Sequence, residues 1–558
     1  MSSDTPELTP VEGIKARSNY LRGTIADGLA DSATGALADD DTQLTKFHGF
    51  YQQDDRDARS DRQRRKLEPA YSFMVRVRVP GGIATPSQWL ALDKLATTHA
   101  NRTLRLTTRQ AFQFHGVIKR DLKTTIRGIN DSLLDTIAAC GDVNRNVMCT
   151  PLAEQSRVHA AALDTAARIS EHLTPRTRAY HELWLDGERV DGAEDHEPVY
   201  GPTYLPRKFK IGVAIPPSND VDIFSQDLGF IGIERDGELA GFNVTAGGGL
   251  GMTHGEPETY PRVADVIGFC TPQQAVDVAE QVVRLQRDFG DRNNRKHARL
   301  KYTIDDRGLP WFRDELERRL GYALGEAAPF GFESRGDRFG WLEDRHGDWH
   351  LTLFVPQGRI KDDDSAQLLS GLREIARVHT GEFRLTANQN LIVSRIGASE
   401  RPRIEALLDE YGIQALQQVS PLRQQALACV AMPTCALAMA EAERWLPELT
   451  AKTDALLADA GLANESVSLR ITGCPNGCAR PYLAEVALVG KAPGRYSLFL
   501  GGDPYGRRLN RQVLENADEA TLFATLADWF TRFARERDNG EPFGDFADRM
   551  LTAMAGQG

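Results

Sequence analysis

One pattern of apolar and polar positions occurs twice along this chain. The stretch "VRVPGGI" (77–83), followed by "LRLTTRQAFQFHGV" (104–117), is echoed by "LFVPQGRI" (353–360) and "FRLTANQNLIVSRI" (383–396). The two RLT tripeptides lie 279 residues apart, which is half the chain. Two copies of one pattern indicate an internal duplication and predict a pseudo-twofold molecule rather than a solenoid of many repeats.

The periodicity inside the first copy predicts the elements of each repeat. Residues 71–79 and 111–117 alternate between apolar and polar as strands do, whereas 87–100 has helical spacing and 122–137 is amphipathic. Strand, helix, strand and helix in this order predict an α+β unit of the ferredoxin-like kind.

The segments behind the repeats echo each other too. Residues 229–251 and 485–506 each read as an apolar strand, a glycine turn, a second strand and a glycine-rich end. The glycine-rich "AGGGLG" (246–251) lacks the G-x-G-x-x-G spacing of a nucleotide loop, so a turn at a strand end is expected. A shared ligand is expected in the cleft between the two halves.

Residues 434–449, "TCALAMAEAERWLPEL", are rich in helix formers. With Thr434 as N-cap, a helix starting there would place Cys435 in its first turn, where backbone N–H groups can bond to a thiolate.

Length and charge limit the protein class. A chain of 558 residues with 41% hydrophobic content can bury more than one core, so at least two domains are expected. The N-terminus lacks the apolar segment of a signal peptide, and no apolar run is long enough to cross a bilayer, so a cytoplasmic protein is expected. The net charge of −11 gives no general attraction to nucleic acid or to anionic membranes. An anion site therefore requires a local basic patch.

Four of the seven cysteines form two close pairs. Cys429 and Cys435 are followed, after 38 intervening residues, by Cys474 and Cys478, which flank a Pro-Asn-Gly turn. In a reducing compartment such pairs indicate a metal site rather than disulfides. Either an iron–sulfur cluster or a structural zinc would suit four thiolates, although the first spacing is long for a zinc knuckle, and chance spacing is the remaining alternative. The other three cysteines are interpreted as small buried residues.

Islands of positive charge stand out in this acidic chain. Arg76, Arg78, Arg105 and Arg109 lie on or beside predicted strands, which suggests guanidinium groups aimed at carboxylates or an oxyanion. The alternative is that each island is a solvated surface run. Further basic residues of this kind are Arg145, Arg207, Lys208, Lys210, Arg292, Arg295, Lys296, Arg299 and Lys301.

These segments resemble the assimilatory sulfite reductase haemoproteins of the nitrite/sulfite reductase family. The resemblance is carried by "ACVAMPTCALAMAEAERWLP" and "ITGCPNGCARPYLAEVALVGKAPGRYSLFLGG", and by "NYLRGTI", "HGFYQQDDRDAR", "LRLTTRQAFQFHG", "NRNV", "TYLPRKFK" and "GFGDF". It extends from about residue 19 to residue 547.

The resemblance implies a sirohaem coupled to a [4Fe-4S] cluster and the six-electron reduction of sulfite to sulfide, in sulfate assimilation and cysteine biosynthesis. Cys429, Cys435, Cys474 and Cys478 would hold the cluster, and the Cys478 sulfur would also be the axial ligand of the sirohaem iron. Asn476 would shape the turn between the last two thiolates.

The resemblance also implies roles for the cations. Arg76, Arg145, Lys208 and Lys210 would bind the substrate anion and deliver protons. The sirohaem would be lined by Arg105, Thr107, Arg109, Gln113, His115, Arg207 and Arg299. From the residues alone, His115 reads as a satisfied core histidine rather than as a ligand. Tyr71 and Cys149 flank two of these motifs, and whether their side chains meet is left open.

A domain division follows from the repeats together with the resemblance. Residues 66–138 and 341–415 are expected to be ferredoxin-like half-domains, and 139–340 and 416–558 to be two larger α+β domains around a shared cofactor cleft. The charge-dense residues 1–65 are expected to form an arm, either as a docking segment for a partner or packed back on the core.

The electron donor is expected to be a flavoprotein reductase subunit, because the chain contains no dinucleotide fingerprint. A ferredoxin-dependent sulfite or nitrite reductase is the alternative within the family. A dissimilatory enzyme is disfavoured, because no further cysteine cluster is present for an inserted ferredoxin domain. A zinc-stabilised anion-binding protein without redox chemistry is the alternative outside the family.

Overall fold

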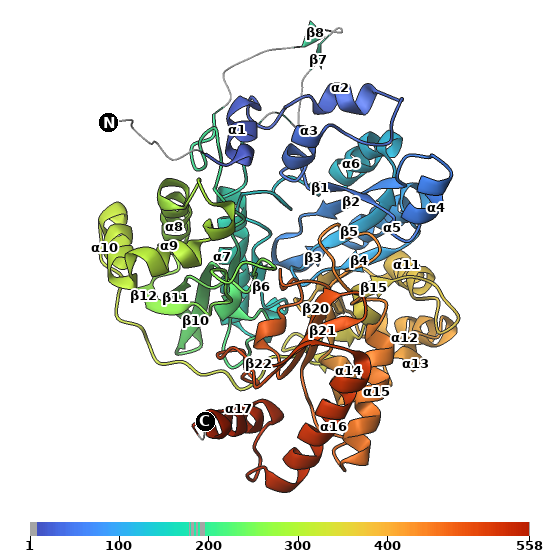
Figure 1. Cartoon of the computed structure of the whole chain (residues 1–558), viewed down its shortest axis with the longest axis vertical. Helices are drawn as coiled ribbons and strands as arrows, with labels where there is room; N and C mark the ends of the chain where they lie inside the picture. Colours follow the sequence, from blue (N-terminus) through green and yellow to red (C-terminus); the bar gives the residue numbers. More distant parts are fainter. Residues whose placement is uncertain (1–7, 178, 180–183, 186–187, 190–195, 557–558) are drawn as a thin grey trace.

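The computed structural model describes residues 8–556, except 178, 180–183, 186–187 and 190–195. Four five-stranded sheets with helices packed around them, and a two-stranded sheet of β7 (Trp184–Leu185) and β8 (Glu188–Arg189), form the described part of the chain (Figure 1). Both helices and sheets occur in each half, so the predicted α+β fold with internal duplication is confirmed. The first seven residues of the expected arm lie outside the described residues.

Two of the sheets form the ferredoxin-like pair. The first has the order β1-β2-β5-β4-β15, and its strands are β1 (Phe50–Asp54), β2 (Tyr71–Val77), β5 (Phe112–Val117), β4 (Leu104–Leu106) and β15 (Arg359–Ile360). The second has the order β13-β14-β17-β16-β3, and its strands are β13 (Gly340–Glu343), β14 (Trp349–Leu353), β17 (Leu391–Ile396), β16 (Glu382–Leu385) and β3 (Ile83–Ala84). Each half thus lends one short strand, β3 or β15, to the sheet of the other half.

The two ferredoxin-like halves also share one hydrophobic core. Helix α5 (Pro86–His99) begins at the capping box of Thr85 and buries Trp89 completely. The Trp89 ring stacks on Phe383 of the second half, with ring centroids 4.5 Å apart. Exchanged strands and a common core mean that neither half is an independent unit.

The other two sheets also have a common topology. One has the order β12-β11-β10-β9-β6, and its strands are β6 (Met148–Cys149), β9 (Ile211–Ala214), β10 (Leu228–Arg235), β11 (Glu238–Ala246) and β12 (Asp265–Cys270). The other has the order β18-β19-β20-β21-β22, and its strands are β18 (Leu427–Ala428), β19 (Leu469–Thr472), β20 (Val486–Ala492), β21 (Arg495–Leu500) and β22 (Arg511–Ala517). In both sheets the first two pairings along the chain are parallel and the last two antiparallel.

The shared topology gives a residue-by-residue correspondence between the halves. Short 3-10 turns, η4 (Ile223–Ser225) and η7 (Pro481–Leu483), precede the third strand of each sheet. Each turn follows a residue in the left-handed conformation, Asp222 with φ 49° and Arg480 with φ 54°. The separation between these two residues equals that between the first residues of β9 and β19. Positions near these strands can therefore be compared directly.

The remaining helices cover the sheets. They are α1 (Pro10–Arg17), α2 (Ile25–Ala30), α3 (Asp39–Leu44), α4 (Arg59–Arg64), α6 (Leu122–Asp131), α7 (Arg157–His172), α8 (Ala275–Phe289), α9 (Leu300–Arg307), α10 (Leu309–Leu320), α11 (Leu368–Val378), α12 (Arg401–Glu410), α13 (Ile413–Leu416), α14 (Pro421–Gln424), α15 (Leu446–Asp459), α16 (Glu519–Glu536) and α17 (Phe543–Ala555). In the described ranges, none of the helices combines the length and apolar character needed to cross a membrane.

The helix expected over residues 434–449 is wrong for most of its length. Residues 434–445 form turns, and α15 begins only at Leu446. The backbone N–H groups of Met439 and Ala440 donate to the carbonyl of Gly473, at 2.7 and 3.1 Å. A tertiary contact with the second cysteine loop therefore replaces the hydrogen bonds that the helix would have made.

The N-terminal segment packs back on the core over much of its described length. Residues 50–54 form β1, which pairs with β2 and corresponds to β13 in the second half. Lys15 Nζ donates to the Leu205 carbonyl at 2.8 Å. The duplicated core thus begins earlier in the chain than the expected arm allowed.

Candidate metal centre and anion site

The four clustered cysteines lie on two facing loops. Cys429 follows β18 directly, and Cys474 and Cys478 lie on the loop after β19. The Gly473 N–H donates to the Cys429 sulfur at 3.3 Å, and the Asn476 amide lies 3.6 Å from the Cys474 sulfur. Because β18 and β19 are parallel neighbours, both loops leave the same edge of the sheet.

The thiols lie close enough to influence one another. Burial raises the pKa of Cys429 well above its ordinary value, and the neighbouring Cys478, Cys474 and Cys435 raise it further. Burial and Cys478 also raise the pKa of Cys474 to about 11. Such thiols ionise only with a strong positive partner, which bound metal ions supply.

In the described part of the chain, no group of three or more His, Cys, Asp or Glu side chains is arranged to hold a single metal ion. Thiolates around one zinc lie about 2.3 Å from the metal, whereas a [4Fe-4S] cluster binds its four cysteines through separate irons. Four thiols on two facing loops are compatible with the larger group.

Two arginines form one wall of an adjoining cationic site. Arg76, on β2, and Arg145 both donate to the carbonyl of Ala139, at 3.3 and 3.4 Å. The Gln113 amide oxygen accepts from Arg76 Nε at 2.9 Å when the amide faces the guanidinium. The structure thus brings these three predicted residues together.

Lys208 and Lys210 carry further charge in the same region. Burial lowers the pKa of Lys208 to about 7, helped by Arg207 and Arg299 and opposed by Cys478. Burial, then Lys208 and Arg109, lowers the pKa of Lys210 well below its ordinary value. Both side chains are half-buried, and within the described residues neither ammonium group has a hydrogen-bond or ion-pair partner. An anion bound beside them would supply the missing charge.

Several predicted cofactor residues are instead committed to protein partners. Arg105 is ion-paired with Glu443 and donates to the Ala428 carbonyl at 2.9 Å. Arg299 is paired with Asp227 at 2.8 Å. Thr107 accepts from the backbone of its own turn, so its hydroxyl stabilises the RLT loop.

Two predicted residues keep unpartnered buried atoms. In the described structure both ring nitrogens of His115 and the Nε of Arg109 lack a partner, although the two side chains are buried. Burial, then Arg359 and Arg105, lowers the pKa of His115 well below its ordinary value, so the ring is neutral. A buried histidine without hydrogen bonds destabilises a protein core. It is better explained by a bound group that supplies the missing hydrogen bonds. These atoms and the free cations fit a carboxylate-rich macrocycle such as sirohaem.

Tyr51 and Cys140 belong to this site and were missed from the sequence. Burial, then Cys140, raises the pKa of Tyr51 to about 12, while Arg145 and Arg76 oppose the shift. Tyr51 lies on β1, which the repeat pattern did not reveal. By contrast, Tyr71 lies on β2 and Cys149 on β6, in two different sheets.

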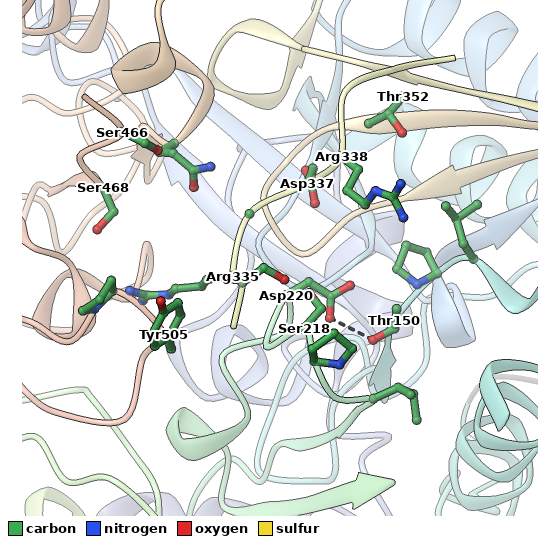
Figure 2. Close-up of a pocket in the computed structure, with 18 of the residues that line it drawn as sticks. Thr150, Ser218, Asp220, Arg335, Asp337, Arg338, Thr352, Ser466, Ser468 and Tyr505 are labelled. Carbon is green, nitrogen blue, oxygen red and sulfur yellow. Dashed lines mark hydrogen bonds between the residues drawn. The ribbon is translucent and has the colours of Figure 1, made fainter. Parts of the chain in front are cut away.

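A cavity of about 520 Å³ occupies the corresponding place in the other half (Figure 2). Ser466 and Ser468 line it at the positions that correspond to Lys208 and Lys210. Thr352, paired with Ile392 as Arg76 is with Gln113, also lines it. This cavity therefore has neutral hydroxyl side chains where the first site has Lys208, Lys210 and Arg76, although Arg335 and Arg338 line it elsewhere.

The second cavity also lacks the thiols. Thr150 occupies the position that corresponds to Cys429, because each residue directly follows the first strand of its sheet, β6 or β18. Asp220 corresponds to Cys478, because each lies two residues before the left-handed residue of its half. Thr150 donates to Asp220 at 2.9 Å, and burial raises the pKa of Asp220 to about 7 (Figure 2). Among the described residues, the candidate metal centre therefore lies in the second half alone.

Comparison with known proteins agrees with the geometry. The family described as "Nitrite and sulphite reductase 4Fe-4S domain" matches residues 164–324, and the "Nitrite/Sulfite reductase ferredoxin-like half domain" matches residues 65–132 and 342–411. Two relatives bear the name "Sulfite reductase [NADPH] hemoprotein beta-component". The one from Myxococcus xanthus is 59% identical over 98% of both chains. The one from Shouchella clausii is 58% identical over 97% of this chain and 95% of its own.

A solved structure has the same fold. The "Structure of Mycobacterium tuberculosis NirA protein" superposes with a TM-score of 0.80 over 97% of both chains, at 24% identity.

Proposed function

Since this chain belongs to the nitrite and sulphite reductase family, we propose that it reduces sulfite to sulfide at a sirohaem bridged to a [4Fe-4S] cluster. One observation supports this function above the others. Two facing loops carry four cysteines, and beside them lie lysine side chains that have no ion-pair partner among the described residues. Reduction of one bisulfite consumes six electrons and six protons and releases three waters. The site must therefore bind an oxyanion and deliver protons repeatedly.

The cysteines of the two loops would hold the metal centre. Cys429, Cys435, Cys474 and Cys478 would each bind one iron of the cluster, and Cys478 would also face the sirohaem iron. Cys478 is exposed while Cys474 is buried, which suits a thiolate shared with a second group. When bound, the two cofactors supply electrons and an iron to which the anion can bind.

The cations would bind the substrate and protonate it. Arg76 and Arg145 have fixed donors because both are anchored on Ala139, so they suit orientation of the sulfite oxygens. Burial lowers the pKa of Lys208 to about 7, which makes this residue a proton donor near neutral pH, and burial also lowers the pKa of Lys210, so its proton is released more easily than that of an ordinary lysine. The arginines would thus bind and orient the anion, and the lysines would supply its protons.

Around the sirohaem, the residues divide by how free they are. Both ring nitrogens of His115 are unpartnered within the described chain, and Arg109 keeps only Nε unpartnered, because its other two nitrogens donate to Gln226 and to the Ile211 carbonyl. Together with the half-buried Arg207, these residues would contact the macrocycle and its carboxylates. Arg105, Thr107, Gln113 and Arg299 already have protein partners, so they would shape the wall of the site. Asn476 would support the Cys474 thiolate.

The electrons would come from a flavoprotein component. The names of the relatives specify NADPH, which gives up two electrons together as hydride. Haem and iron–sulfur clusters accept electrons one at a time. A flavin can accept a hydride and pass its two electrons on singly. The exposed helix α4 (Arg59–Arg64) is a docking candidate because its segment lies beside the metal centre. There, Arg56 Nη1 donates to the carbonyl of Ala438, three residues after Cys435, at 2.6 Å.

We expect the purified chain to reduce sulfite with a chemically reduced viologen dye but not with NADPH. The viologen passes electrons singly, and the chain has no dinucleotide-binding fingerprint for NADPH. Sulfide release would be measured with each donor, and then with NADPH after addition of a flavoprotein reductase. Steady NADPH oxidation coupled to sulfide release by the chain alone would contradict this division of labour.

A further inference from the structure

One ion pair joins the two halves at their corresponding positions. Arg480 Nε donates to the Asp222 carboxylate, and these residues occupy the same place in the two halves, each before its 3-10 turn. Both hold a left-handed backbone conformation, which is unfavourable for a residue other than glycine. Because one of these corresponding residues is an arginine and the other an aspartate, their side chains attract each other across the pseudo-twofold axis.

Arg480 uses its other nitrogens on both ferredoxin-like halves. Nη1 donates to the carbonyl of Thr108 at 2.8 Å, and Nη2 donates to the carbonyl of Ala387 at 2.9 Å. Thr108 and Ala387 follow the two RLT tripeptides directly, so they are corresponding residues. One guanidinium therefore contacts both RLT turns and the opposite large domain.

The same network reaches the cysteine expected to bridge the cofactors. Arg480 lies two residues after Cys478, and the Thr108 hydroxyl donates to the Cys478 carbonyl at 3.0 Å. Both ends of this short segment are thus tied to the first RLT turn. The backbone that carries the Cys478 side chain is therefore held at both ends of the segment.

Asp222 is held by two more arginines. Arg335 Nε donates to one carboxylate oxygen at 2.6 Å, and Arg470 Nη1 donates to the other at 2.7 Å. All four side chains of the network are at least nine-tenths buried. A buried charge cluster is expensive unless its geometry is well satisfied, so its position is sharply defined.

We propose that Arg480, braced by Asp222, is the positioning residue that fixes the Cys478 thiolate for its role between cluster and sirohaem. This inference rests on the proposed function. A purely structural arginine would stabilise the fold without affecting the electronic properties of the metal centre. A positioning arginine affects both, because the orientation of a ligand sulfur and its hydrogen bonds tune the centre's potential.

The test compares Arg480→Lys with Arg384→Lys in the cofactor-loaded protein. Lysine keeps a positive charge beside Asp222, but its single ammonium group cannot donate to Asp222 and to both RLT carbonyls as the three guanidinium nitrogens do. Arg384 is the matched control, since it is 2% exposed, forms ion pairs with Glu154 and Glu382, and contacts neither cysteine loop. Iron and acid-labile sulfide content, unfolding temperature, electron paramagnetic resonance and reduction potential would be measured for each.

Arg480→Lys is expected to shift the potential and the resonance signal of the sirohaem, and to lower kcat about tenfold with the KM for sulfite unchanged. Arg384→Lys is expected to lower only the unfolding temperature. Spectrum and potential equal to the parent's in Arg480→Lys would overturn the proposal.

If Arg480→Lys does not load its cofactors, Thr108→Val decides. It removes one hydroxyl hydrogen bond to Cys478 and keeps the side-chain shape. A displaced resonance signal supports the positioning role, and a parent-like signal overturns it. A parent protein without iron or labile sulfide would instead refute the proposed function itself.

Discussion

Lys210→Ala is expected to lose sulfite reduction by about a hundredfold or more while keeping both cofactors, because general-acid groups contribute about 10²–10⁴ in rate. The ammonium group of Lys210 has no protein partner within the described chain, so its removal breaks no ion pair. Sulfide release with reduced viologen, the visible spectrum and iron content would be measured together.

Two companion variants separate charge from proton donation. Lys210→Arg keeps a positive charge but replaces an ammonium group whose pKa is lowered by burial with a guanidinium that holds its proton, so kcat should fall more than KM rises. Lys491→Ala, which removes a lysine paired with Glu515 on the surface, should leave both constants unchanged. Full turnover in Lys210→Ala would place the anion site elsewhere, whereas failure to fold would make the lysine structural.

Cys478→Ser is expected to be the most damaging change among the four cysteines, because it affects both centres. Serine is a poor ligand for iron, so the variant should lose the normal sirohaem spectrum, part of its cluster iron and nearly all activity. Absorption spectra and iron analysis would be compared with the parent.

Cys270→Ser is the matched control, because this thiol is buried on β12, away from both cysteine loops. It should cost stability without changing the spectrum. A normal sirohaem spectrum with normal activity in Cys478→Ser would remove the bridging assignment and leave the other three cysteines as the only metal ligands.

Much of the fold was predictable because the duplication repeats a periodic pattern. Alternation over 71–79 and 111–117 predicted β2 and β5, and the helical spacing of 87–100 predicted α5. The strand exchange of β3 and β15 was not predictable, since two-residue strands leave no periodic signal. Helix propensity predicted a helix over 434–449, but residues 434–445 are not helical. The Gly473 carbonyl accepts hydrogen bonds from the backbone N–H groups of Met439 and Ala440 instead.

The cysteines of the site were predictable from spacing, whereas the partners of the arginines were not. Arg105 and Arg76 look alike in sequence, each on a strand of the first repeat. Arg105 is ion-paired with Glu443, a residue more than 300 positions away, while Arg76 faces Gln113 and the carbonyl of Ala139. Tyr51 was missed for the same reason, because its neighbour Cys140 comes from a distant loop.

The most direct test of one bridged metal centre for each chain is analysis of iron, acid-labile sulfide and zinc in the purified protein, combined with its visible spectrum. We predict about five iron and four sulfide for each chain, no zinc, and the absorption bands of a haem. A colourless protein with zinc and without labile sulfide would contradict the account, because the four thiols would then hold a structural ion and the cations would serve binding alone.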